Sequence, residues 1–489
     1  MTDRWANFGL DLHLELDPAR KGRSLEDALR SAIHDGRLAQ GTRLPASRVL
    51  ASDLGMARNS VADAYGQLTA EGWLEARTGS GTWVSARMDT QSGTGTGRVD
   101  RPRSAATATT VVQRASRPRA LALDLRGGIP DASMFPRAGW AAAARRAVNG
   151  AAPADLGYPA AQGAGRLRDT LAEYLTRARG VFAAPEHVLI THGFGELLSL
   201  TCRVLCASGA RRIAVEEYGH ELHRSIMSAA GMEVIPIRVD AEGAIVAELE
   251  SVGADAVLLT AAHQFPIGVP LSAARRAEVT RWAERTGGLI IEDDYDGEFR
   301  YDRRSIGALQ ALAPQQVLYV GTASKSLAPA VGLAWSVVPD RLISPLLEER
   351  RGLGAAADTL TQLTLAEFMQ NHHYDRHVRQ LRAHYRLRRE ELEATFAALV
   401  PHAKLSGLSA GLHCLVELPA SVAEARVTTE AVARGLAFEG LTDFLPAGRV
   451  PSRAPAMVVG YGAPPEHRYA QAIAAAAEAI AAAMVAPAR

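Results

Sequence analysis

Cysteine is scarce in this chain, which has only Cys202, Cys206 and Cys414 among its 489 residues. Three cysteines provide neither a disulfide framework nor a complete cysteine metal site, and so few are consistent with a reducing compartment. The sequence also lacks a run of about 18 apolar residues and a charged-then-apolar leader, the patterns of a membrane span and a secretion signal. We therefore expect a cytoplasmic protein that has no contact with a membrane.

An excess of charge is lacking as well. The chain has 54 lysine plus arginine residues against 53 aspartate plus glutamate residues, a net charge of +1. A protein so nearly neutral does not attract polyanions over its whole surface, so any face that binds nucleic acid must be local. Its 47% hydrophobic and 22% charged content is ordinary for globular domains, and its length favours more than one domain.

Residues 1–84 have the pattern of three short helices followed by a β-hairpin. Apolar side chains at helical spacing, each set closed by a glycine, predict helices over residues 25–33, 44–54 and 59–72. Two short apolar segments then flank a glycine-rich turn at residues 77–81, which predicts a hairpin. Three helices and a hairpin in this order are typical of a winged helix-turn-helix.

Basic and polar side chains occur where such a domain would meet DNA. The predicted third helix begins with Arg58, Asn59 and Ser60, and its amides and guanidinium group can reach phosphates and base edges. Further candidate contacts precede the second helix, lie on it or belong to the hairpin: Arg43, Arg48, Arg77 and Gly79. The alternative is a small protein-interaction domain with scattered surface arginines.

The composition changes abruptly between residues 85 and 120. Glycine, serine, threonine, proline and several arginines leave little apolar surface to bury in this segment. We predict a flexible, mildly basic linker. Its arginines could touch the DNA backbone, but a solvated tether is the simpler interpretation.

Residues 121–489 have the pattern of a large α/β domain. Apolar segments alternate with helical stretches at residues 188–191, 213–215, 234–236, 256–260, 289–293, 317–321 and 333–338. Seven such segments predict a mostly parallel, doubly wound sheet. An arginine-rich helical stretch follows, and a smaller α/β lobe is expected from residue 405 onward, with strands at 411–417 and 457–461.

One lysine has an unusual place, in a polar turn between two of these apolar segments. Lys325 follows a buried strand and the small residues Gly321, Thr322 and Ala323. Burial makes an ammonium group costly and lowers its pKa, and the neutral amine is the nucleophile of Schiff-base chemistry. A loop lysine that points into solvent is the alternative, and this stretch alone does not decide between them.

Carboxylates and a tyrosine follow another predicted strand. Asp293 and Tyr295 stand at its carboxyl end, where open α/β sheets bind ligands. A carboxylate there can keep a pyridine nitrogen protonated, and a lysine with such a partner is the arrangement that binds pyridoxal 5'-phosphate, PLP. An acidic run after a strand is otherwise a solvated loop. The order of acids, tyrosine and then lysine favours a functional site.

Several motifs resemble one family. The segments IIEDDYDGEFRY, HQFPIG and GTASKSLAP resemble the fold-type-I aminotransferase-like module of MocR-type regulators in the GntR superfamily, and RLPASR with LGMARNSVADAY resembles the GntR winged helix. The resemblance covers nearly the whole chain. It implies that Lys325 is the Schiff-base lysine, Asp293 the partner of the pyridine nitrogen and Tyr295 a contact to the ring oxygen. It also implies that the main DNA contacts are Arg48, Arg58, Asn59 and Gly79.

Other positions match this family in part. The resemblance places His263 beside the cofactor ring, with an ordinary loop histidine as the alternative, and His220 at the position of the stacking aromatic. Tyr158 matches a tyrosine that reaches the phosphate of the partner subunit in related dimers, with a plain turn aromatic as the alternative.

The phosphate-binding groups depart most from the family pattern. The turn at Gly193, Phe194 and Gly195 is expected to open a helix at Glu196, and its backbone amides suit an anion, but the usual hydroxyl and amide side chains are missing at Phe194 and Gly195. Thr322 and Ser324 can supply hydroxyl groups. Gly332 replaces the usual phosphate arginine and Val458 the usual carboxylate arginine. Loss of the phosphate arginine should weaken phosphate binding, because charge-assisted bonds contribute about 1.5–3 kcal/mol.

We predict a homodimeric transcriptional regulator whose winged helix binds operator DNA. Its large domain is expected to sense PLP, or an adduct of PLP with an amino acid or amine, and no residue is assigned to turnover. Two alternatives stay open. One is an active PLP-dependent aminotransferase with an accessory DNA-binding head, and the other is a regulator whose large domain no longer binds PLP.

Overall fold

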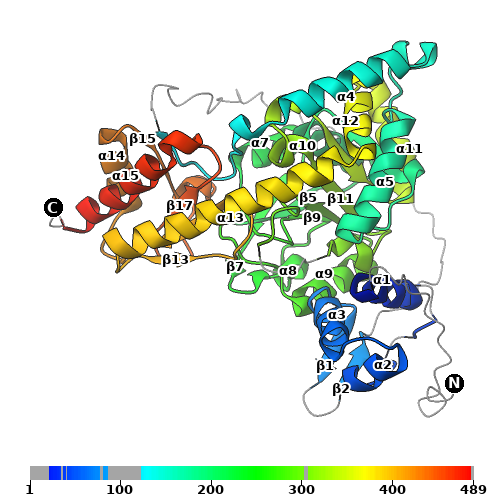
Figure 1. The fold of residues 1–489 in the computed structure, drawn as a ribbon, viewed down its shortest axis with the longest axis horizontal. Helices are drawn as coiled ribbons and strands as arrows, with labels where there is room; N and C mark the ends of the chain where they lie inside the picture. Colours follow the sequence, from blue (N-terminus) through cyan, green and yellow to red (C-terminus); the bar gives the residue numbers. More distant parts are fainter. Residues whose placement is uncertain are drawn as a thin grey trace.

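The computed structural model describes residues 21–34, 37–39, 41–77, 81–85, 123–301 and 307–485 (Figure 1). Within these ranges the side chains of residues 21–23, 34, 53 and 77 are not described. The predicted linker 85–120 lies outside the described residues apart from Ser85, as does the predicted wing contact Gly79. For Arg77 only the backbone is described.

The N-terminal residues 21–85, which we call the head, form the predicted winged helix-turn-helix. Its elements in order are α1 (Lys21–His34), α2 (Ser47–Asp53), α3 (Arg58–Ala70), β1 (Leu74–Arg77) and β2 (Gly81–Val84). The second helix begins at Ser47 and not at Leu44 as predicted. Pro45 disfavours the helical conformation of the residue before it, and the Leu44 amide instead donates a 2.8 Å hydrogen bond to the Thr82 carbonyl of the wing.

The apolar spacing of α3 explains how the head packs. Val61, Ala64, Tyr65 and Leu68 are buried, which is the face that a spacing of three and four residues predicts. They form one core with the apolar side chains of α1 and with the antiparallel hairpin β1–β2. The opposite side of α3 is left for contacts outside the head.

The large domain is built on a seven-stranded sheet, and all seven predicted strands are present. They are β4 (Val188–Thr191), β5 (Arg212–Glu216), β6 (Glu233–Ile237), β9 (Ala256–Leu259), β10 (Leu289–Asp293), β11 (Val317–Thr322) and β12 (Ala334–Val337). Their order is β4-β12-β11-β10-β9-β5-β6. Only β12 runs antiparallel to its neighbours β4 and β11, so the prediction of a mostly parallel sheet is confirmed.

Helices cover both faces of this sheet, which is why its strands read as continuous apolar runs. Leu189, Ile291 and Val320 pack on one face against α6 (Phe194–Ala207), α7 (Glu221–Ala229) and α11 (Asp340–Gly352). The other face packs against α4 (Arg137–Gly150), α5 (Gly165–Arg179), α9 (Ala273–Thr286) and α12 (Thr359–Gln370). The domain therefore has three layers.

The predicted arginine-rich helix is α13 (His373–Leu399), which runs from the large sheet to the small lobe (Figure 1). The small lobe has an antiparallel sheet in the order β13-β14-β17-β16. Its strands are β13 (Lys404–Ser406), β14 (His413–Glu417), β17 (Ala456–Gly460) and β16 (Glu439–Gly440), covered by α14 (Glu424–Ala433) and α15 (Glu466–Val485). None of the described helices has the length and apolarity that crossing a membrane requires.

The head is docked on the large domain beneath α9 (Figure 1). Trp73 meets Phe182 edge to face, with ring centroids 6.2 Å apart, and the same apolar cluster includes Leu312 of the large domain. Arg30 of α1 and Glu71, at the end of α3, form a buried 2.8 Å ion pair at this junction. The close approach needs Gly307, because a Cβ there would lie 2.8 Å from the Glu71 carboxyl carbon.

Candidate functional site

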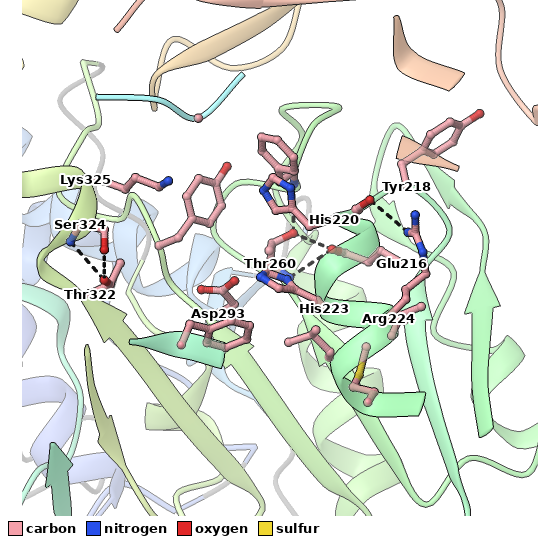
Figure 2. Close-up of a pocket in the computed structure, with 18 residues that line it drawn as sticks. Glu216, Tyr218, His220, His223, Arg224, Thr260, Asp293, Thr322, Ser324 and Lys325 are labelled. Atoms are coloured by element: carbon pink, nitrogen blue, oxygen red, sulfur yellow. Dashed lines mark hydrogen bonds between the residues drawn. The ribbon is translucent and has the colours of Figure 1, made fainter. Parts of the chain in front are cut away.

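A cavity opens at the carboxyl ends of β5, β9, β10 and β11, where ligands bind in open α/β sheets (Figure 2). Sequence-predicted residues that line it are Phe194, His220, Asp293, Tyr295, Thr322, Ser324 and Lys325. Its other walls include Gly128, Glu216, Tyr218, His223, Arg224, Met227, Thr260 and Phe265. Residues from segments far apart in the chain thus meet at one site.

Lys325 enters the cavity from a single helical turn, α10 (Ala323–Ser326), that directly follows β11. The Thr322 hydroxyl caps this turn by accepting a hydrogen bond from the Ser324 amide at 3.1 Å. Burial lowers the pKa of the Lys325 amine, while the nearby carboxylates of Asp293 and Asp296 act in the opposite direction. A lowered pKa increases the share of neutral amine, the form that attacks a carbonyl group.

Asp293 ends β10 and faces the same cavity, as Figure 2 shows. Burial raises the pKa of its carboxyl group to about 8, although the positive charge of Lys325 acts to lower it. At neutral pH a pKa this high favours the protonated form of the Asp293 carboxyl group. A protonated carboxyl group at this place is a proton source for a basic nitrogen that enters the cavity.

Tyr295 is buried beside the cavity, and a second layer of polar side chains holds its ring. Its hydroxyl lies 3.3 Å from His263 Nδ1 and donates to the His263 carbonyl at 3.2 Å. His263 Nδ1 also pairs with Asp296 Oδ2 at 2.8 Å. His263 was expected beside the cofactor ring, but the structure places it behind Tyr295, outside the cavity lining. Its position makes it a support for the tyrosine.

His413 of β14 brings the small lobe into this second layer. Its ring lies 4.9 Å from that of His263, and ligand atoms of His263, Asp296 and His413 lie within 4.8 Å of one another. Two histidines and a carboxylate are ligands that divalent metals accept. However, the His263–Asp296 hydrogen bond already accounts for two of the three groups. We interpret the cluster as support for Tyr295.

His220 forms one wall of the cavity. Its ring stacks on Phe265 with centroids 4.3 Å apart and an interplanar angle of 19°. Burial lowers the pKa of His220 well below its usual value, and the charges of His223, Lys325 and Arg224 act in the same direction. The imidazole is therefore neutral and presents a flat apolar face, which is what a stacking position requires.

Three charged or titratable residues of the cavity were not predicted from the sequence. His223 and Arg224 follow His220 by three and four residues on α7, so one helix face carries them to the same wall. Burial lowers the pKa of His223 to about 4. Glu216 has a pKa of about 7 because it is buried, and it accepts a 2.5 Å hydrogen bond from the Thr260 hydroxyl. For His223 and Arg224, the helical spacing from His220 was the signal that could have predicted their position.

The predicted phosphate-binding residues are only partly brought together. Thr322 Oγ1 and Ser324 Oγ lie 3.0 Å apart at the cavity edge. Gly193 is the N-cap of α6 at φ +114°, a left-handed value that favours glycine. Gly195 lies outside the cavity lining and allows close packing on α7, because a Cβ there would lie 3.2 Å from Ile226 Cδ1. Tyr158 is fully exposed and lies outside the cavity of its own chain.

The head leaves its predicted DNA contacts open to solvent. Arg43, Arg48, Arg58 and Asn59 are exposed and Ser60 is half-buried. Among the described residues no side chain caps the start of α3, so the Arg58 and Asn59 amides are open to a phosphate. The Arg43 guanidinium lies over the Trp83 ring at 5.7 Å, which holds it beside the wing.

Comparison with known proteins identifies a family for each part of the chain and relatives that contain both parts. The family of bacterial regulatory proteins, gntR family, matches residues 21–84, and the family of class I and II aminotransferases matches residues 127–442. The pyridoxine biosynthesis transcriptional regulator PdxR of Corynebacterium glutamicum is 32% identical over 88% of this chain and 89% of its own length. The probable rhizopine catabolism regulatory protein MocR of Rhizobium meliloti is 32% identical over 77% and 76%.

The chain belongs to the MocR subfamily of GntR-type transcriptional regulators. It is therefore a DNA-binding regulator, as predicted, and its large domain has the aminotransferase fold. A Pyrococcus horikoshii kynurenine aminotransferase structure superposes with a TM-score of 0.67 at 23% identity, covering 74% of this chain and 92% of that one. Thermus thermophilus LysN, an α-aminoadipate aminotransferase, superposes with a TM-score of 0.66 at 21% identity, covering 74% and 92%. These likenesses concern the fold of this MocR-type chain.

Proposed function

We propose that this MocR-type regulator binds PLP in the cavity at Lys325 and that the bound ligand alters how the head binds operator DNA. The observation that carries the proposal is the buried pair of Lys325 and Asp293 at one cavity, on adjacent strand ends. Bound PLP supplies an aldehyde that a neutral amine attacks and a ring that draws electrons when its nitrogen is protonated. The lowered pKa of Lys325 and the proton held on Asp293 match these two requirements.

The side chains around this pair fit a flat aromatic ligand. His220 and Phe265 offer stacked rings on one wall, and the Tyr295 hydroxyl is held by His263 beside the cavity. The phosphate side has fewer groups, since Thr322 and Ser324 supply hydroxyls and the α6 amides supply donors. The fit is therefore strong for the ring and weaker for the phosphate.

Steady transamination is a poorer fit than sensing. Val458 stands where related modules carry the carboxylate arginine, and it is fully buried on β17. A Cβ on Gly127 would lie 2.8 Å from its side chain, so Val458 packs closely against the Gly127 backbone. A site without this guanidinium loses much of the binding energy for an α-carboxylate. The ligand is then PLP itself, or PLP with an amine or amino acid held by other groups.

We further propose that the regulator acts as a homodimer. Leu156 and Tyr158 are exposed at 61% and 102% in the single chain, beside a short helical turn of the large domain. Two exposed apolar side chains this close in the chain provide apolar surface that a second subunit can cover. Two heads in one dimer would read two half-sites of a palindromic or direct-repeat operator.

Two measurements on the purified protein test the proposal. Titration with PLP should produce the absorbance band of a covalent lysine adduct in the wild type, and Lys325→Ala should abolish it while keeping the same unfolding temperature. Affinity for a DNA fragment selected by the protein from random sequences is then measured with and without PLP. An adduct without any change in DNA affinity would refute the sensing role, and no adduct at all would favour a domain that has lost PLP.

A further inference from the structure

The side of the cavity opposite Lys325 carries a buried arginine with an unused donor group. Arg224 lines the cavity, and its side chain is only 8% exposed. Figure 2 shows Arg224 and Lys325 on opposite sides of the cavity, with His220 between them. Within the described part of the chain, Arg224 Nη2 is buried and makes no hydrogen bond. A buried donor of this kind is costly unless a ligand or a water molecule accepts from it.

The other two nitrogens of this guanidinium group are engaged, and their contacts fix its orientation. Nε donates to Glu221 Oε2 at 3.0 Å, about one turn earlier on α7, and Nη1 donates to the Gly219 carbonyl at 3.0 Å, just before this helix. The Glu221 side chain is half exposed, so water screens its charge and the pair compensates the arginine only in part. Nη2 is therefore a charged donor that is held in place and still available.

The charges on the walls of the cavity favour an anion near Arg224. Burial lowers the pKa of His223 to about 4, and the charges of Lys325 and Arg224 act in the same direction, so both cations lie within electrostatic reach of one imidazole. The two acids that line the cavity are Asp293 and Glu216, whose pKa values burial raises to about 8 and about 7. A guanidinium group, in contrast, keeps its charge. Positive charge therefore exceeds negative charge around the cavity, and an anionic group of a ligand would balance it.

The hydroxyl groups suited to a phosphate lie on the other side of the cavity. Thr322 caps the turn that carries Lys325, and Ser324 belongs to this turn. Figure 2 shows both hydroxyl residues beside the lysine and away from Arg224. The usual place of a carboxylate arginine is also apolar, since Val458 is buried there. The free donor of Arg224 thus fits a second anionic group, separate from the phosphate.

We propose that Arg224 binds the anionic group of an effector whose amine lies at the Lys325 side of the cavity. This inference rests on the proposed function and makes it more specific, because the effector is then an amine that carries a carboxylate or a sulfonate and not a plain amine. Hydrogen bonds from a guanidinium group to such anions are among the stronger polar contacts in proteins. The opposite positions of Lys325 and Arg224 favour effectors whose anion is several bonds away from the amine.

The experiment pairs each of several amino acids with the amine that lacks its carboxylate. The series runs from glycine with methylamine to 5-aminopentanoate with butylamine, and each compound is titrated into the protein loaded with PLP. The change in PLP absorbance gives the dissociation constant of each compound. The ratio of the two constants within one variant is compared between variants, because differences in PLP occupancy cancel in this ratio.

We expect the wild type to bind the longer amino acids at least about tenfold more tightly than their amines. Arg224→Met should abolish this preference, because methionine fills similar space without a charge or a donor. Arg224→Lys keeps the charge on a shorter group and should retain part of the preference. Arg203→Met on α6 should match the wild type, since Arg203 is also a helical arginine in an ion pair, with Glu349 at 3.7 Å, but lies outside the cavity lining.

Several results would contradict the inference. The same ratio in wild type and Arg224→Met overturns it, and so does a wild type that responds to no pair or prefers no amino acid, while its adduct with PLP leaves the proposed function intact. If Arg224→Met weakens PLP relative to pyridoxal and keeps the ratio, the arginine binds the phosphate and the inference is wrong. A wild type that forms no adduct with PLP overturns the proposed function and this inference together. Unfolding temperatures show whether each variant is folded, and Arg224→Lys decides the question if Arg224→Met is not.

Discussion

Glu292 and Asp293 are consecutive residues of β10, and their carboxyl groups lie on opposite faces of the sheet. Asp293 faces the cavity with Lys325, whereas Glu292 accepts hydrogen bonds from the Leu309 and Gln310 amides at 2.6 and 2.9 Å. Burial raises the pKa of Glu292 to about 7, while the charge of Arg276 acts to lower it. The cavity and the face of the sheet on which the head is docked are therefore connected by two adjacent residues of β10.

Arg276 extends this connection to the head. It is fully buried, donates to the Gly307 carbonyl, and lies within electrostatic reach of both Glu292 and Glu71. Glu71 belongs to the end of α3, the helix whose start carries Arg58. Buried polar groups are therefore contiguous from the cavity end of β10 to the end of α3, and the proposed sensing requires them to adopt two arrangements.

Asp293→Asn should raise the stability of the unliganded protein while weakening PLP. Burial raises the pKa of Asp293 to about 8, so between pH of about 4 and 8 the folded protein holds a proton that the unfolded chain releases. Stability therefore falls across this window as pH rises, and asparagine removes the loss. Thermal unfolding should show a gain of a few degrees for the variant at pH 8 and none at pH 4.

The same variant should bind PLP at least about tenfold more weakly, because asparagine has no proton for the ring nitrogen. Absorbance titration with PLP checks this part. If Asp293→Asn changes neither the pH profile of unfolding nor the affinity for PLP, Asp293 is not the partner of the ring nitrogen.

Arg30→Met should detach or destabilise the head. The Arg30–Glu71 pair is 2.8 Å long with side chains 9% and 4% exposed, so removal of the arginine takes the ion-pair partner from a buried carboxylate that then keeps the 2.5 Å hydrogen bond from Gln67. Loss of one partner of such a pair costs about 3–5 kcal/mol. Chemical unfolding followed by intrinsic tryptophan fluorescence measures the loss. The double variant Arg30→Met with Glu71→Leu should recover most of it, and equal loss in both would refute the electrostatic reason.

Arg58→Ala should weaken DNA binding and leave ligand binding intact. Arg58 is exposed at the uncapped start of α3, and an arginine that contacts a base edge contributes about 1–3 kcal/mol. Fluorescence anisotropy with the selected DNA fragment measures affinity at several salt concentrations. Arg386→Ala on α13 is the control, since its side chain is 55% exposed and lies outside the head. The absorbance of the PLP adduct should be the same in both variants.

His413→Leu should leave stability unchanged or raise it. His413 is fully buried and neither ring nitrogen makes a hydrogen bond of normal geometry within the described part of the chain. Burial lowers its pKa well below the usual value, although the Pro266 carbonyl acts in the opposite direction. An apolar side chain of similar size removes the cost of burying the ring.

His263→Leu is the matched comparison for this residue. It should cost about 1–3 kcal/mol, because it leaves Asp296 without its 2.8 Å partner. A loss of similar size in His413→Leu, measured by chemical unfolding, would show that a bound ion or an additional hydrogen bond uses the His413 ring.

The local sequence pattern determined the strands of the large domain and the position of two site residues. Apolar periodicity was sufficient to predict all seven strands of the large sheet, because strands buried on both faces need continuous apolar runs. It also placed Asp293 and Lys325 at the carboxyl ends of strands, and in a parallel sheet these ends lie at the same edge regardless of the loop conformations. The exposed start of α3 at Arg58 likewise follows from which side of that helix is apolar.

Packing between distant segments decided the rest. The place of His263 behind Tyr295 and the ion pair of Arg30 with Glu71 join residues from separate elements. No spacing in the sequence encodes such distances, because they depend on strand order, on register and on how the head docks. Sequence periodicity reports which face of an element is buried, and only the assembled fold determines what lies against that face.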